Sequence, residues 1–347
     1  MGECMKKVLL VNQGFSNNLG DKLIAYSLGL FLNESGFEVQ KAGFTCFQET
    51  DIGKINFNSY KAERKMDLPI WMKWFLKKKR ATQKYISSFG DDYDYLIIGG
   101  GQLLKTACYF PYALRKWIDF GKKHARKIIL IGVGADSSFS QIEKKIYIKS
   151  LKECERIIVR DSFSQKILSE IFGVESSVLP DVAFLYSKSM IGHFRDELYP
   201  VVMPFDFDTY KYHFKNTKTF EEYYFEWKKY IDDELEKCDR VMLAYTTSED
   251  KKACYLLKDY LGKQYNSKVL IKETDSLDSL IDCISHATKL YTSRMHAMII
   301  GYMMNKDIEC VSVSQKTDQF KKEFLEAKKP AYVYSEILIR ELNDIMK

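Results

Sequence analysis

The sequence lacks any apolar run approaching the roughly 20 residues that cross a bilayer. Its start, M-G-E-C-M-K-K-V-L-L-V, has an apolar run too short for a signal peptide. Gly2 is not followed by Ser or Thr at position 6, which disfavours myristoylation. We therefore expect a cytoplasmic protein.

Cysteine pairs and a dinucleotide fingerprint are also missing. The eight cysteines are scattered with no C-x-x-C pair, which indicates reduced thiols. Cys283 and His286 share a helix face, but no second pair completes a zinc site, so we expect no metal. No G-x-G-x-x-G motif follows the first predicted strand. This disfavours a dehydrogenase, and we expect no cofactor.

The net charge is small. A formal charge of +6 over 347 residues suits an anionic substrate or a membrane surface, but it lacks the basic stripe of a nucleic-acid-binding protein. The segment Pro69–Arg80, P-I-W-M-K-W-F-L-K-K-K-R, mixes aromatic and basic residues. It fits either an amphipathic helix with a solvated basic face or a patch that touches anionic lipid or a long glycan. Lipid contact would make the protein peripheral at the cytoplasmic membrane face.

What the sequence does contain is a regular alternation of short apolar runs with helical patterns. This alternation predicts an α/β fold with parallel sheets wound on both faces. At 347 residues the chain exceeds what one core usually supports, and the pattern lapses near Ser187–Leu198. We expect a Rossmann-like domain over residues 1–190, with an insertion at about 52–90, and a second over 198–347. The two doubly wound domains would face each other across a cleft, with ligands at the carboxyl ends of the strands.

Several predicted strands end in small or polar residues. These ends are Gly99-Gly100-Gly101, Arg160-Asp161 and Asp181. A strand that stops at glycines lets a ligand approach closely, or forms a tight turn. Arg160 is either an anion-binding residue or half of a local ion pair with Asp161. Asp181 either faces the predicted cleft or hydrogen-bonds a loop.

The first predicted strand, Lys7–Asn12, is followed by a polar loop and a predicted helix over Asp21–Ser35. Asn18, Gly20 and Asp21 lie where the loop meets the helix, a usual position for ligand contact in an open α/β sheet. Asp21 is either a catalytic base or a first-turn acid that favours the helix dipole.

The segment Thr288–Met304, T-K-L-Y-T-S-R-M-H-A-M-I-I-G-Y-M-M, carries the most informative pattern. A short apolar strand is followed by apolar residues at helical spacing, with Ser293 predicted as the N-cap. Arg294 and His296 would then lie in the first turn, where free amides and the helix dipole favour an anion. Such a site suits a phosphorylated or carboxylated substrate, although an Arg and a His there can also be ordinary surface groups.

Five short motifs, taken in order, resemble the polysaccharide pyruvyl transferase family. They span most of the chain and are listed here in sequence order: Asn18-Leu19-Gly20-Asp21, Gly99-Gly100-Gly101, Arg160-Asp161 with Ser164, Asp181-Val182-Ala183 and Ser293-Arg294-Met295-His296. Val182 stands where Pro is frequent in the family, and Met295 where Leu is usual. Both exchanges are apolar and leave the polar positions intact.

The resemblance implies a glycosyltransferase-B-like fold of two Rossmann-type domains. It also implies transfer of a pyruvyl group from phosphoenolpyruvate onto two hydroxyls of a sugar, as a cyclic ketal, in exopolysaccharide or cell-wall synthesis. The family's last motif is linked to phosphoenolpyruvate binding and catalysis, which points to Arg294 and His296 here. The acceptor is left open, and a lipid-linked precursor is one candidate.

The residue types suit this chemistry. Phosphoenolpyruvate carries a phosphate and a carboxylate, which favours Arg294 and Arg160 as ligands over lysines. An imidazole moves protons near neutral pH, so His296 is the predicted general acid and base. Asn18 and Asp21 would orient the acceptor or help to bind the donor.

Two alternatives remain. A nucleotide-sugar glycosyltransferase of the same architecture also has an anionic donor, which Arg294 and the helix terminus would serve equally. A non-catalytic glycan- or lipid-binding protein would depend instead on Pro69–Arg80.

Overall fold

The computed structural model describes residues 5–45, 70–90, 92–106, 109–193, 195–214, 218–312 and 315–347. It confirms the predicted α/β class, since two sheets are present and every strand pair in them is parallel. The chain forms two compact units. The first unit comprises Met1–Asn17, Ile24–Val182 and Arg340–Lys347, and the second comprises Asn18–Leu23 and Ala183–Ile339.

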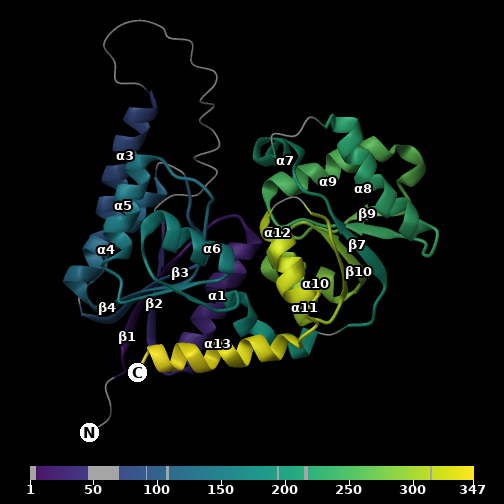
Figure 1. Ribbon diagram of the computed structural model, residues 1–347. Coiled ribbons are helices and arrows are strands. Elements are labelled where there is room, and N and C mark those ends of the chain that lie inside the picture. The colour runs from purple at the N-terminus through teal and green to yellow at the C-terminus, as the bar shows by residue number, and fades with distance from the viewer. Residues whose placement is uncertain are drawn as a thin grey trace, which may run out of the picture. The chain divides into compact units, whose positions relative to one another are not determined.

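The sheet of the first unit has six strands in the order β2-β1-β3-β4-β5-β6. Figure 1 labels β1, β2, β3 and β4 of this sheet. The strands are β1 (Lys7–Asn12), β2 (Glu38–Gly43), β3 (Tyr93–Leu104), β4 (Ala125–Ala135), β5 (Arg156–Val159) and β6 (Ser177–Val178). The helices are α1 (Leu19–Glu34), α3 (Ile70–Ile86), α4 (Phe110–His124), α5 (Gln141–Leu151) and α6 (Ser162–Ile167), which continues as a π-helical turn over Leu168–Phe172. A 3-10 segment, Val182–His193, follows β6.

Alternating side chains of β1 cover opposite faces of this sheet. Leu9 and Val11 belong to the core formed with α4, α5 and α6. On the other face, Leu10 lies close to α1, where its Cδ2 is 4.0 Å from the position of a Cβ on Gly29. Because successive residues of a strand point to opposite faces, both faces are buried under helices. This arrangement is the predicted doubly wound one.

The sheet of the second unit has five strands in the order β11-β10-β7-β8-β9. The strands are β7 (Tyr199–Met203), β8 (Val241–Leu243), β9 (Val269–Ile271), β10 (Ala287–Thr292) and β11 (Asp307–Cys310). The helices are α7 (Phe207–Phe214), α8 (Phe220–Leu235), α9 (Ser248–Leu261), α10 (Leu277–Ser285), α11 (Met295–Met303), α12 (Gln315–Phe320) and α13 (Ala331–Ile345). The residues of α13 from Arg340 onward belong to the first unit. Short 3-10 and π-helical turns cover Lys263–Tyr265 and Lys321–Leu325.

The second sheet is also covered on both faces. Tyr291 of β10 belongs to the core with α8 and α9. Its neighbour Leu290 faces α11, where a Cβ on Gly301 would lie 2.9 Å from the Leu290 Cδ2. From β7 the chain winds outward through β8 and β9, and then returns to β10 on the other side of β7. The carboxyl ends of β7 and β10 therefore form the topological switch point, the usual ligand position in such sheets.

Two strands differ from expectation. β3 was predicted to stop before Gly99, but it continues through all three glycines to Leu104, with Gly100 and Gly101 at φ of +80° and +82°. Positive φ interrupts the strand geometry without ending the pairing with β4. β2 had no sequence signal, because its residues E-V-Q-K-A-G are largely exposed and form no apolar run.

The basic aromatic segment begins outside the described residues, at Pro69, and continues as α3 (Ile70–Ile86). It is therefore helical, as the amphipathic-helix interpretation required, and its contact with lipid or glycan stays a prediction. No helix within the described ranges combines the length and apolar character needed to span a membrane.

Candidate active site

The S-R-M-H motif lies at the switch point of the second sheet. Ser293 and Arg294 follow β10, and Phe205 and Asp206 follow β7, the neighbouring strand. The sequence pattern thus placed the motif correctly at the junction of a strand and a helix. It placed the helix start one residue too early.

Arg294, not Ser293, is the N-cap of α11. Its backbone is extended, with φ of −91° and ψ of 113°, and its own side chain makes no capping hydrogen bond. The prediction of Ser293 as a cap is therefore wrong. Ser293 is 3% exposed, and its buried Oγ has no hydrogen-bond partner within the described part of the chain. The first amides of α11 have no intrahelical acceptor, and the helix dipole favours an anion at this end.

The Arg294 guanidinium is held in one orientation. Its Nε donates to Asp250 Oδ2 at 2.7 Å, and its Nη2 donates to Asp250 Oδ1 at 2.5 Å and to Thr247 Oγ1 at 3.4 Å. The guanidinium carbon lies 4.1 Å from the centroid of the Phe205 ring, a cation–π contact. Nη1 takes part in none of the hydrogen bonds made by the described residues. Its two N–H groups can therefore face a ligand.

Asp250 is the residue that the sequence analysis missed. It lies in the first turn of α9, and its side chain is 2% exposed. The Thr246 hydroxyl donates to Oδ2 at 3.2 Å, and the backbone N–H of Asp206 donates to Oδ1 at 3.3 Å. The Thr247-x-x-Asp250 spacing signals only a helix start. Nothing in it indicates an arginine 44 positions away in the chain.

His296 packs against the first turn of α1. A Cβ built on Gly20 would lie 2.3 Å from His296 Nδ1 and 2.8 Å from its Cγ. No side chain larger than hydrogen fits there unless the imidazole moves. The backbone N–H of Leu19 donates to the Thr246 carbonyl at 3.0 Å, which fixes the turn beside the motif. The structure thus brings together two sequence motifs from opposite ends of the chain.

The other residues predicted from the first loop surround this contact. Asn18 Oδ1 accepts a hydrogen bond from the Gly20 N–H at 2.9 Å, so Asn18 shapes the start of α1. Asp21 is half-buried in the first turn of α1. All the polar side chains named so far belong to the second unit.

Arg160 and Asp181 form a separate cluster in the first unit. Arg160 is 6% exposed; its Nη1 donates to Asp181 Oδ2 at 3.3 Å and its Nη2 to Gln102 Oε1 at 3.0 Å. Its Nε lies 3.5 Å from Asp161 Oδ2, so the ion pair considered from the sequence is present as part of a larger network. Asp181, 3% exposed, is an internal partner of the arginine.

Two of the three glycines, Gly99 and Gly100, serve packing inside the first unit. A Cβ on Gly99 would lie 2.6 Å from the Ile131 carbonyl oxygen. A Cβ on Gly100 would lie 1.9 Å from Ile24 Cγ2, a clash with α1. Gly100 also lies against Val182, the residue that replaces the proline frequent in the resembled family. These contacts account for Gly99 and Gly100 without a ligand.

A family model described as polysaccharide pyruvyl transferase matches residues 18–308, which begin at Asn18 and include the S-R-M-H motif. The chain belongs to the polysaccharide pyruvyl transferase family. It is therefore a transferase of polysaccharide biosynthesis. A comparison with curated proteins finds no match.

Solved structures share the fold of this member of the family. UDP-N-acetylglucosamine 2-epimerase from Rickettsia bellii has a TM-score of 0.55 and 9% identity, over 99% of this chain and 96% of that chain. The UDP-GlcNAc 2-epimerase of Methanocaldococcus jannaschii has a TM-score of 0.54 and 10% identity, over 98% of this chain and 99% of that chain. A glycosyltransferase from Rickettsia africae ESF-5 has a TM-score of 0.51 and 10% identity, over 99% of this chain and 98% of that chain. These likenesses confirm the predicted glycosyltransferase-B-like fold of Rossmann-type domains and concern the fold alone.

Proposed function

We propose that this transferase moves the enolpyruvyl group of phosphoenolpyruvate onto two hydroxyls of a sugar, giving a cyclic pyruvate ketal and phosphate. The observation that carries the proposal is the contact between the N-L-G-D and S-R-M-H motifs. Gly20 makes room for the His296 ring, and Asp250 holds the guanidinium of Arg294, two residues earlier in the chain. Fixed donors and an imidazole at one helix N-terminus suit a small donor that carries two anionic groups.

Three groups can bind the phosphate and carboxylate of the donor. They are Nη1 of Arg294, the first amides of α11 and the buried hydroxyl of Ser293. Asp250 offsets much of the Arg294 charge, so the directed N–H groups provide recognition more than net charge does. This arrangement favours a ligand whose oxygens match the donor positions.

The reaction needs one proton delivered and two removed. A general acid protonates the methylene carbon of the enol, and positive charge develops at C2. A sugar hydroxyl adds to C2 and loses its proton, phosphate leaves from C2, and the neighbouring hydroxyl adds to the same carbon and loses its proton. The product carries a methyl and a carboxylate on the ketal carbon, and the departing phosphate takes up the remaining proton.

His296 is the proposed general acid and base, because an imidazole exchanges protons near neutral pH. A positioned proton donor contributes about a hundred- to ten-thousand-fold in rate, or roughly 3–5 kcal/mol. Asp21 is the proposed base for a sugar hydroxyl, and Asn18 and Gly20 shape the turn that carries it.

For the first unit we propose a supporting role. The Arg160 guanidinium is buried among Asp161, Asp181 and Gln102, so its charge is already neutralised. Its contribution would be to hold the carboxyl ends of β4 and β5 in place, and contact with the donor would require this network to open.

The test is to incubate the protein with phosphoenolpyruvate and a panel of free, nucleotide-linked and lipid-linked glycosides. We expect phosphate release that depends on the sugar, with a mass gain of one carboxyethylidene group per phosphate. Transfer from a nucleotide sugar, with no consumption of phosphoenolpyruvate, would instead support the glycosyltransferase alternative. Glycan binding that survives Arg294→Ala and His296→Ala, with no turnover of either donor, would support a binding protein.

A variant in the first turn of α1 tests the motif contact itself. Gly20→Ala would place a methyl group 2.3 Å from His296 Nδ1, so the ring must move. We expect turnover to fall at least tenfold, since small misplacements of a catalytic group are costly. In a His296→Ala background the same substitution should change turnover little. An equal loss of turnover in both backgrounds would show that Gly20 acts independently of His296.

A further inference from the structure

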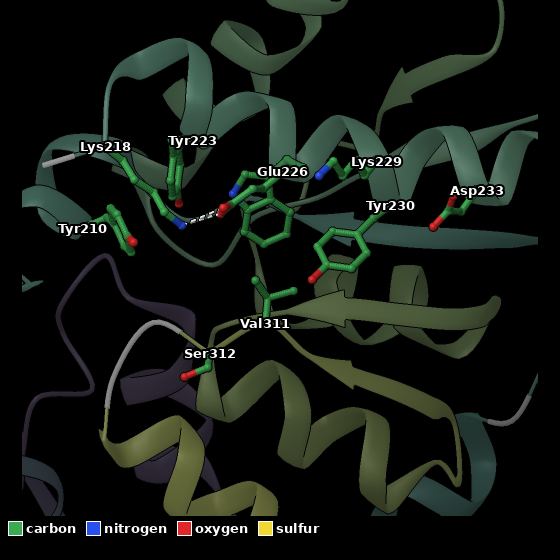
Figure 2. Close-up of a pocket in the computed structure, with 10 residues that line it drawn as sticks. Tyr210, Lys218, Tyr223, Glu226, Lys229, Tyr230, Asp233, Val311 and Ser312 are labelled. Carbon is green, nitrogen blue, oxygen red and sulfur yellow. Dashed lines mark hydrogen bonds and ion pairs between the residues drawn. The ribbon is translucent and has the colours of Figure 1, made fainter. Parts of the chain in front are cut away.

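The second unit contains a cavity of about 460 Å³. Figure 2 shows side chains of α8 on one side of it and Val311 and Ser312 on the other. Its lining comprises Tyr210, Lys218, Tyr223, Glu226, Trp227, Lys229, Tyr230, Asp233, Val311 and Ser312. Small-molecule sites usually measure about 300–1,000 Å³, so the volume suits a compact ligand.

The lining combines aromatic rings with charges that cancel. Four of the lining residues are tyrosine or tryptophan, and the lining also holds two lysines and two carboxylates. Lys218 donates to Glu226 at 2.7 Å, and this hydrogen bond raises the pKa of the lysine, so the pair stays ionised. A phosphate or nucleotide would meet no net positive charge here. A neutral ligand with many hydroxyls would find donors, acceptors and ring faces together.

The cavity is joined to the candidate active site by two contacts. The Tyr223 hydroxyl donates to the Phe205 carbonyl at 2.8 Å, and the Phe205 ring lies under the Arg294 guanidinium. Burial raises the pKa of Tyr223, which keeps that donor protonated. On the opposite wall, the Val311 N–H donates to the Thr292 carbonyl at 3.0 Å, two residues before Arg294. The cavity is thus beside the catalytic motif but separate from it.

We propose that this cavity binds a pyranose ring of the acceptor, one sugar removed from the sugar that receives the ketal. This proposal rests on the proposed function, because it assigns the acceptor a chain of at least two sugars. The weakly polarised C–H groups on the apolar face of a pyranose suit the negative face of an aromatic ring. The Lys218–Glu226 pair and Ser312 would hydrogen-bond the ring hydroxyls.

Tyr230 gives the sharpest test, since it is half-buried and lines the cavity. Tyr230→Leu removes the ring, and Tyr230→Phe keeps it. Tyr332→Leu is the matched control, because Tyr332 is 57% exposed on α13 and lines no part of the cavity. We expect Tyr230→Leu to raise KM for a disaccharide glycoside about three- to tenfold, with KM for phosphoenolpyruvate unchanged. Tyr230→Phe and the control should stay within twofold of the parent.

Binding without turnover separates this proposal from the proposed function. Saturation-transfer NMR is run with His296→Ala and methyl glycosides of common hexoses and N-acetylhexosamines, with the matching disaccharides and UDP as probes. We expect disaccharide signals that weaken in Tyr230→Leu and exceed those of monosaccharides. Such signals without phosphate release by the parent would sink the proposed function and leave sugar binding intact. Sugar-dependent phosphate release with an unchanged KM for the disaccharide in Tyr230→Leu would overturn the cavity proposal. Binding of UDP that is abolished by Tyr230→Leu would also overturn it, and so would the absence of saturable binding of any disaccharide.

Discussion

Asp250→Asn is the most informative single substitution, because Asp250 contacts the S-R-M-H motif through the Arg294 guanidinium. The asparagine keeps the shape of the side chain but loses its charge. Its oxygen can accept one of the two guanidinium hydrogen bonds, while its NH₂ group faces the other donor. Removing one partner of a buried ion pair costs about 3–5 kcal/mol. The Arg294 side chain is 23% exposed, so water recovers part of that loss. We therefore expect Asp250→Asn to cost about 2–3 kcal/mol of the free energy that holds the Arg294 guanidinium in place.

The same loss of free energy should appear as weaker binding of the transition state, because the Arg294 guanidinium is misplaced. A loss of 2–3 kcal/mol corresponds to a fall in kcat/KM for phosphoenolpyruvate of roughly 30- to 150-fold. The assay is continuous phosphate release with a saturating sugar acceptor. Circular dichroism and urea unfolding establish how much folded protein is present. Asp282→Asn is the control, since that carboxylate is 49% exposed and does not contact Arg294.

A double-mutant cycle decides whether Asp250 acts through Arg294. If it does, Asp250→Asn should change kcat/KM little once Arg294→Ala is present. Additive losses would show that Asp250 acts independently of the guanidinium. Tighter binding of phosphoenolpyruvate to Asp250→Asn would show that the carboxylate merely neutralises charge. Either result would refute the positioning argument.

His296→Ala should lower kcat by about a hundred- to ten-thousand-fold and leave the Kd for phosphoenolpyruvate within a few fold, since its proposed role is proton transfer; a proportionate loss of binding in calorimetry would reassign it. Gly100→Ala should destabilise the fold by about 2–4 kcal/mol in urea unfolding, because strain at φ of +80° adds to a clash with α1. Gly36→Ala, at φ of +82° with open space around it, should cost only about 1–2 kcal/mol, and equal losses would refute the packing argument. Burial raises the pKa of the Cys154 and Cys283 thiols to about 12. The two protonated thiols stabilise the folded state fully below the unfolded thiol pKa of about 8.5. This stabilisation is lost as the pH rises towards 12, so the urea midpoint should fall over that range. Mass spectrometry should find the Cys283 thiol, which is fully buried, alkylated at pH of about 8 only after unfolding.

Periodicity predicted the alternation of strands and helices because both sheets are parallel and buried on two faces. It also predicted that Arg294 and His296 follow a strand and begin a helix, which is a local property. Periodicity did not predict the polar edge strand β2, because its sequence contains no apolar run. The glycines after Ile98 were wrongly expected to end β3, because a sequence does not show that positive φ can occur inside a paired strand.

The tertiary contacts of the site were beyond sequence reasoning. The pairing of Asp250 with Arg294 and the packing of Gly20 on His296 join segments far apart in the chain, and no spacing rule connects them. The burial of Arg160 was equally hidden, because a strand-end arginine beside an aspartate fits both a ligand site and an internal network. Order and spacing suggest candidate residues for the chemistry, and packing decides their geometry.

The most direct measurement uses phosphoenolpyruvate labelled with ¹³C at C2, followed by NMR in the presence of the protein and a disaccharide acceptor. The account predicts that the enol carbon signal is replaced by a ketal carbon signal on the sugar, as phosphate appears in equal amount. A label that stays in phosphoenolpyruvate, or passes only to free pyruvate with every acceptor in the panel, would contradict it.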